Sequence, residues 1–141
     1  MSGFVTALMH RGPRTALSRY TELCGLLYAA MGLFFAFAPG VATGLLGLTT
    51  TTDAEGYVRL LGLTLSVIGY FYWFGGRTGA KSFGVATVVD RLALPFVLLP
   101  MAFVGWIEWP IAIAFSILDP LMGLGALIIW MRGGGDPPEA A

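Results

Sequence analysis

Residues 23–48, LCGLLYAAMGLFFAFAPGVATGLLGL, contain no charged side chain and decide the class of fold. An uninterrupted apolar run of about 20 residues is what a membrane-spanning helix needs. Pro39 and Gly40 interrupt this run, because proline breaks a helix and glycine commonly follows a helix end. We therefore predict a first helix that begins a turn before residue 23 and ends near Ala38. A short interfacial piece over 41–48 should follow it.

The composition of the whole chain agrees with a membrane protein. Of its 141 residues, 57% are hydrophobic and 11% are charged, and the mean hydropathy is +0.80. Soluble domains usually carry about 25% charged residues. The 8 basic and 8 acidic residues cancel, so the chain has no net positive field for nucleic acid. These numbers exclude a soluble globular domain, a disordered chain and a nucleic-acid-binding protein.

Three further apolar stretches predict an all-α, integral membrane four-helix bundle. The expected spans cover about 20–38, 54–74, 81–104 and 110–131. Residues 49–53 are a polar loop with good helix-capping side chains, and Pro110 suits the first turn of the fourth helix. The predicted organisation is a basic cytoplasmic N-terminal segment over 1–19, a membrane domain over 20–132 and a flexible polar tail over 133–141.

The basic residues predict the orientation in the membrane. They lie before the first span, in the second loop and after the fourth span, at Arg11, Arg14, Arg19, Arg77, Lys81 and Arg132. The positive-inside rule makes this end cytoplasmic, so both termini should be cytoplasmic in an inner membrane. Aromatic residues are assigned to an inner belt (Tyr20, Tyr72, Trp73, Trp130) and an outer belt (Tyr57, Trp106, Trp109).

The N-terminus allows two targeting alternatives. Residues 36–38, AFA, are similar to a signal-peptide cleavage site, but the long basic segment favours a retained span. The Arg-rich, acid-free start is also similar to a mitochondrial transit segment, so the type of organism stays open.

The chain has few side chains that are typical of catalytic or metal sites. The chain has one cysteine, Cys24, and one histidine, His10. Together they cannot form an intrachain disulfide, a zinc site, a bis-histidine haem site or a catalytic triad within the membrane. The sequence therefore predicts no catalytic residue, no metal and no cofactor, and it favours a non-enzymatic role.

Four charged residues fall inside the expected spans, at Arg59, Asp90, Arg91 and Asp119. Each costs about 2.5–3.5 kcal/mol in a bilayer on insertion scales, so such residues are functional-site hypotheses by default. Arg59 could extend to the outer surface or pair with Glu55, one turn earlier. It begins a small and polar stripe typical of a helix-packing face, continued by Gly62, Ser66, Gly69 and Trp73.

Arg91 and Asp119 are expected to meet. They lie roughly 15 Å and 19 Å from the inner surface at 1.5 Å per residue, on neighbouring antiparallel spans. We predict an Arg91–Asp119 ion pair. A stripe of small residues around the carboxylate supports close helix packing there, at Ala112, Ser116, Gly123 and Ala126.

The remaining charge, Asp90, has four expected positions. It could bond Tyr70, bond Thr87, face the second span, or share Arg91 with Asp119 in a small network. The candidate binding residues are Arg59, Ser66, Tyr70, Asp90, Arg91 and Asp119. The alternative to a binding role is structural, because a buried polar pair can simply hold helix register.

Two segments carry a resemblance to a known group. Residues 55–62 and 69–72, EGYVRLLG and GYFY, together with residues 87–92, TVVDRL, and the later Asp119, resemble small bacterial four-span proteins of the DoxX-like group. The similarity covers the layout from about Leu23 to Arg132. Some proteins of that group are associated with thiosulfate:quinone oxidoreduction or with redox partners. No catalytic residue is carried over, because this chain has no motif for that chemistry.

Three functions are compatible with these features. The first is a non-enzymatic membrane subunit or binding module, in a larger membrane complex or a homo-oligomer. The second is a protein or enzyme that binds a lipid, quinone or isoprenoid through Asp90, Arg91 and Asp119. The third is a small oligomeric transporter that uses Asp119 to carry protons or cations.

Overall fold

The protein is an all-α four-helix bundle built from two helical hairpins. The computed structural model describes residues 3, 6, 9–49 and 51–136. The first hairpin consists of α2 (Ala16–Phe37) and α4 (Thr52–Arg77), with the short helix α3 (Pro39–Leu45) between them. The second hairpin consists of α5 (Lys81–Phe103) and α6 (Trp109–Ile129), which continues as a π-helical turn over Trp130–Gly134.

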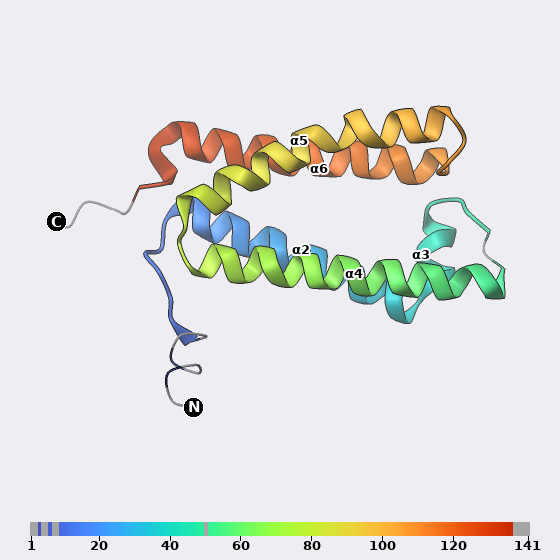
Figure 1. Ribbon diagram of the computed structural model, residues 1–141, viewed down its shortest axis with the longest axis horizontal. Coiled ribbons are helices and arrows are strands. Elements are labelled where there is room, and N and C mark those ends of the chain that lie inside the picture. Colours follow the sequence, from blue (N-terminus) through green and yellow to red (C-terminus); the bar gives the residue numbers. More distant parts are fainter. Residues whose placement is uncertain (1–2, 4–5, 7–8, 50, 137–141) are drawn as a thin grey trace.

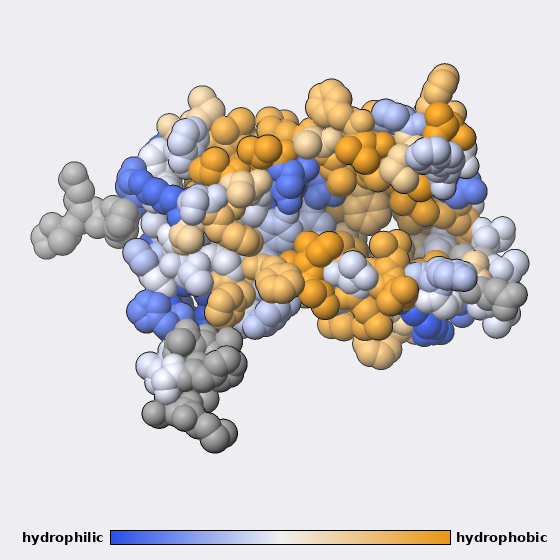
Figure 2. Space-filling model, in the orientation of Figure 1, coloured by the Kyte–Doolittle hydropathy of each residue, from blue (hydrophilic) through white to orange (hydrophobic). Residues whose placement is uncertain are grey.

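The hairpins lie close together at the end that holds both termini and separate toward the opposite end (Figure 1). Four helices are long and apolar enough to cross a membrane, over Ala16–Phe37, Ala54–Arg77, Lys81–Phe103 and Trp109–Gly134. Hydrophilic side chains gather at the end that holds the termini, and apolar side chains cover most of the middle (Figure 2).

Local signals explain where the helices begin and end. Thr15 caps α2 by accepting a hydrogen bond from the Ser18 backbone N–H at 3.0 Å, and the Ser18 hydroxyl accepts one from Thr15 N–H in return. The first helix therefore begins at Ala16, about a turn earlier than predicted. Thr51 caps α4, as the polar loop predicts, and Pro110 lies in the first turn of α6.

The break at Pro39 is confirmed. The piece predicted over 41–48 is the helix α3, which begins at Pro39 and ends at Leu45. The second helix extends to Arg77, three residues beyond its predicted end. Gly79, which has φ +66°, makes the turn that follows it. Of the predicted flexible tail, 137–141 lies outside the described residues, while Asp136 forms an ion pair with Lys81.

Glycine allows α2 and α4 to touch backbone to backbone. A Cβ atom at Gly32 would lie 2.5 Å from the carbonyl oxygen of Gly62, and one at Gly62 would lie 2.5 Å from the backbone nitrogen of Ala36. The glycines on this interface recur every seven residues, at Gly25 and Gly32 on α2 and at Gly62, Gly69 and Gly76 on α4. Such spacing keeps small residues on one seam, as in other close membrane-helix pairs. The predicted packing face of the second span is therefore confirmed.

Candidate functional site

The space between the two hairpins contains a cluster of charged and phenolic side chains. Arg91 from α5 lies at the centre of the cluster and is only 2% exposed. Its guanidinium carbon lies 4.7 Å from the ring centre of Tyr72 and 5.4 Å from that of Tyr28. The two rings, from α4 and α2, are stacked with their centres 5.7 Å apart. A desolvated cation on aromatic faces gains about 2 kcal/mol from each close ring.

Each of the two tyrosines donates a hydrogen bond to a carboxylate. The Tyr28 hydroxyl donates to Oδ1 of Asp119 on α6, and the Tyr72 hydroxyl donates to Oδ2 of Asp90 on α5. Asp119 is 6% exposed, whereas Asp90 is exposed on the surface of the chain. Hydrogen bonds to ionised groups are the stronger class. The cluster therefore joins all four long helices through two phenol–carboxylate pairs around one cation.

The predicted Arg91–Asp119 ion pair is wrong. Among the residues that the structure describes, ion pairs join Arg59 to Glu55 and Lys81 to Asp136, and none joins Arg91 to a carboxylate. The Asp119 carboxylate instead accepts a hydrogen bond from the Tyr28 hydroxyl, and the guanidinium of Arg91 packs on the tyrosine rings. The two residues nevertheless line the same pocket.

Two donors of Arg91 have no hydrogen-bond partner. Both Nε and Nη2 are buried and unpaired among the described residues, and so is the hydroxyl of Ser116, one turn from Asp119. Buried polar groups are nearly always paired, and an unpaired one costs about 1–3 kcal/mol, more when it is charged. The cluster therefore contains buried donors whose hydrogen bonds no described residue completes.

Four residues of the cluster line a polar pocket, and two apolar hollows lie beside it; we call these three spaces the cleft. The polar pocket has a volume of about 190 Å³ and is lined by Tyr28, Leu65, Ile68, Asp90, Arg91, Leu94, Phe115 and Asp119. Two apolar hollows have a volume of about 220 Å³ each, one against α3 and one between α4 and α5, to which α2 and α6 also contribute lining residues. Phe115 lines all three spaces, so they adjoin one another. Figure 2 shows the opening between the hairpins.

The other candidate residues lie away from this cluster. The Ser66 hydroxyl donates to the carbonyl oxygens of Gly62 at 3.0 Å and Ala29 at 3.3 Å, so it belongs to the α2–α4 interface. Tyr70 is 46% exposed and stacks on Phe74 with 6.0 Å between the ring centres. Asp90 does not bond Tyr70. The alternative that Asp90 faces the second span is the correct one.

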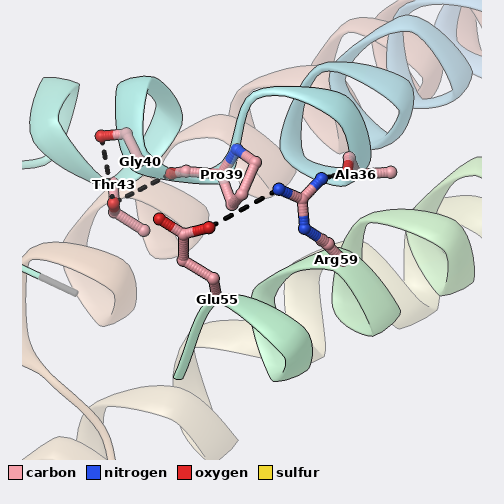
Figure 3. A network of polar contacts seen from close by, with 6 residues as sticks. All are labelled: Ala36, Pro39, Gly40, Thr43, Glu55 and Arg59. Carbon is pink, nitrogen blue, oxygen red and sulfur yellow. Dashed lines mark hydrogen bonds and ion pairs between the residues drawn. The ribbon is translucent and has the colours of Figure 1, made fainter. Parts of the chain in front are cut away.

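Arg59 closes the far end of the first hairpin. Its Nη1 donates to the carbonyl oxygen of Ala36 at 2.8 Å, and its Nη2 lies 3.5 Å from Oε2 of Glu55 (Figure 3). Thr43 holds the neighbouring α3 turn by donating to the carbonyl oxygens of Pro39 and Gly40. Arg59 therefore satisfies the end of α2, where helix carbonyls lack intrahelical partners. The predicted Glu55 pair is confirmed.

Neither tyrosine of the cluster is among the binding residues predicted from the sequence. Tyr72 is assigned above to the inner aromatic belt, but it is 8% exposed and buried in the core, so that assignment is wrong. A signal was present for Tyr28, which follows Cys24 by four residues and precedes Gly32 by four, on the face that packs inward.

Tyr72→Phe is expected to lower the free energy of unfolding by about 1.5 kcal/mol. The reason is that the ionised carboxylate of Asp90 loses the hydrogen bond that it accepts from the Tyr72 hydroxyl. Thermal unfolding of the purified protein in detergent measures this change. Tyr70→Phe is the matched control on the same helix and should stay within about 0.5 kcal/mol of the wild type. Equal stability of the two variants would contradict the Tyr72–Asp90 bond.

Comparison with family models, with curated proteins and with solved structures finds no match for this chain. The fold defines the chain as an all-α four-helix bundle with four candidate membrane-spanning helices. The resemblance to the DoxX-like group stays a prediction.

Proposed function

We propose that this protein is a small, non-enzymatic inner-membrane binding module that holds an amphipathic membrane ligand between its two hairpins. The observation that carries the proposal is that Arg91, whose buried Nε and Nη2 have no hydrogen-bond partner among the described residues, lines a polar pocket next to an apolar hollow. A polar head group would complete the hydrogen bonds of the arginine. An apolar chain would fill the hollows, because their apolar lining has no side chain that could form a hydrogen bond with water.

The proposed orientation has both termini in the cytoplasm. Arg77, Lys81 and Arg132 lie at the same end of the bundle as the N-terminal arginines, and Glu55 and Glu108 lie in or beside the loops at the other end. This asymmetry supports the positive-inside orientation. The cluster then lies within the membrane, where an unpaired donor finds no bulk water.

A photo-crosslinking amino acid at Phe115 tests the proposal. Phe115 touches every part of the cleft, whereas Phe96 on α5 is 82% exposed and serves as the control on the outer surface. After irradiation in native membranes, the Phe115 adducts should contain predominantly one lipid-like species. The Phe96 adducts should reflect the bulk lipid composition. Identical bulk adducts at both positions, or none at Phe115, would contradict a selective site in the cleft.

A further inference from the structure

The hydrogen-bonding groups of the polar pocket restrict the head group that fits there. Each carboxylate of the cluster already accepts a hydrogen bond, Asp119 from Tyr28 and Asp90 from Tyr72. Arg91 also lines the pocket, and its groups that lack a partner are donors, the buried Nε and Nη2. These two nitrogens lie on one edge of the planar guanidinium, which presents them as a fork. A ligand must therefore bring an acceptor, since an ammonium or hydrocarbon head would leave both donors unpaired.

The charge of the pocket restricts the head group further. Arg91 is the one cation among the residues that line this pocket, and it faces two carboxylates. An anionic head group would be attracted by the guanidinium and repelled by both aspartates. In a low-dielectric site such repulsion is strong at short range. An uncharged acceptor satisfies the two donors and adds no charge to the membrane interior.

The lining residues also indicate where an attached chain would lie. Leu65, Leu94 and Phe115 line both the polar pocket and the apolar hollow between α4 and α5. The hollow against α3 shares only Phe115 with the polar pocket. A chain that starts at Arg91 would therefore lie in the hollow that shares more of its lining with the polar pocket, toward the end opposite the termini.

We infer that the ligand carries an uncharged carbonyl oxygen, of an ester or of a ring ketone, which accepts from Nε and Nη2 of Arg91. This inference rests on the proposed function and specifies its ligand class. A carbonyl oxygen has two lone pairs, so one atom can accept from both donors of the fork. The attached apolar chain lies in the hollow between α4 and α5. No covalent step is involved.

The test compares probes that differ in their head group. Methyl palmitate, hexadecyl phosphate and hexadecylammonium share a straight saturated chain of similar length, and an alkyl-substituted benzoquinone represents the ring ketones. Occupancy of the full chain in detergent is read by native mass spectrometry at equal probe concentrations. One or both carbonyl probes should bind at least about tenfold more tightly than the phosphate and the ammonium. The phosphate is disfavoured by its repulsion from the two carboxylates, and the ammonium by its repulsion from Arg91 and its lack of an acceptor. The better carbonyl probe identifies the source.

Asp90→Asn tests the electrostatic reason. Asn retains an oxygen that accepts from Tyr72 but removes one negative charge, so the preference for carbonyl over phosphate should narrow several-fold. Tighter binding of the phosphate or the ammonium to the wild type, with its mass adduct lost in Arg91→Gln, would overturn the head-group assignment and leave the proposed function standing. Equal occupancy by all probes, unchanged in both variants, would overturn the assignment and the proposed function together.

Discussion

Gly62→Leu is expected to separate α2 from α4 and to prevent the bundle from folding. A Cβ at this position would lie 2.5 Å from the Ala36 nitrogen, 2.6 Å from the Gly32 oxygen and 2.9 Å from the Phe35 carbonyl carbon. All three atoms belong to the backbone, so no side chain can rotate away. Overpacking usually costs about 1–3 kcal/mol, and we expect at least the upper end of that range here.

The matched control is Gly56→Leu, on the same helix. Nothing lies within 4 Å of a Cβ at Gly56, and the residue is exposed. Its substitution should leave stability within about 0.5 kcal/mol of the wild type. Size-exclusion profiles and thermal unfolding in detergent measure both variants. Similar melting temperatures for Gly62→Leu and the wild type would show that the close α2–α4 seam does not exist in the protein.

Arg91→Leu should produce the second large effect, a loss of about 3–5 kcal/mol of stability. Removing the only cation that lines the polar pocket leaves the buried Asp119 with no opposite charge near it, and it removes the contacts of the guanidinium with the rings of Tyr28 and Tyr72. Adding Asp119→Asn should recover part of the loss, because one uncompensated charge is removed while an acceptor for Tyr28 remains.

The double variant distinguishes a coupled cluster from independent residues. Unfolding free energies of the wild type, both single variants and the double variant form a thermodynamic cycle. We expect the double variant to be more stable than Arg91→Leu alone. If the two losses of unfolding free energy simply add, Arg91 and Asp119 do not interact energetically, although they line one pocket.

The helices and their packing faces could be predicted from the sequence because both depend on local periodicity. Residues 23–48 and the break at Pro39 are enough to place the first span and α3. The spacing of Gly62, Ser66 and Gly69 is enough to identify the face that meets α2. Apolar length and small-residue spacing are properties of one helix at a time, so they need no knowledge of its neighbours.

The contacts of the cluster could not be predicted in the same way. A rise of 1.5 Å per residue places Arg91 and Asp119 at similar depths, but it does not reveal which side chain lies between them. Tyr28 comes from the first helix, 91 residues from Asp119, and Tyr72 lies 18 residues before Asp90. A tyrosine near a span end fits both an interfacial belt and a buried hydrogen bond, and only the rotation of the packed helix decides between them.

The most direct test of the central claim is native mass spectrometry of the protein extracted from its own membrane in polymer nanodiscs. The account predicts that the wild type retains one lipid-like ligand in stoichiometric amount and that Arg91→Gln loses it. Arg59→Gln, at the far end of the first hairpin, should retain it, because Arg59 contacts Ala36 and Glu55 and does not line the polar pocket. A wild-type protein that carries no ligand, or a ligand that Arg91→Gln retains equally, would contradict the claim that the cleft between the hairpins is a binding site.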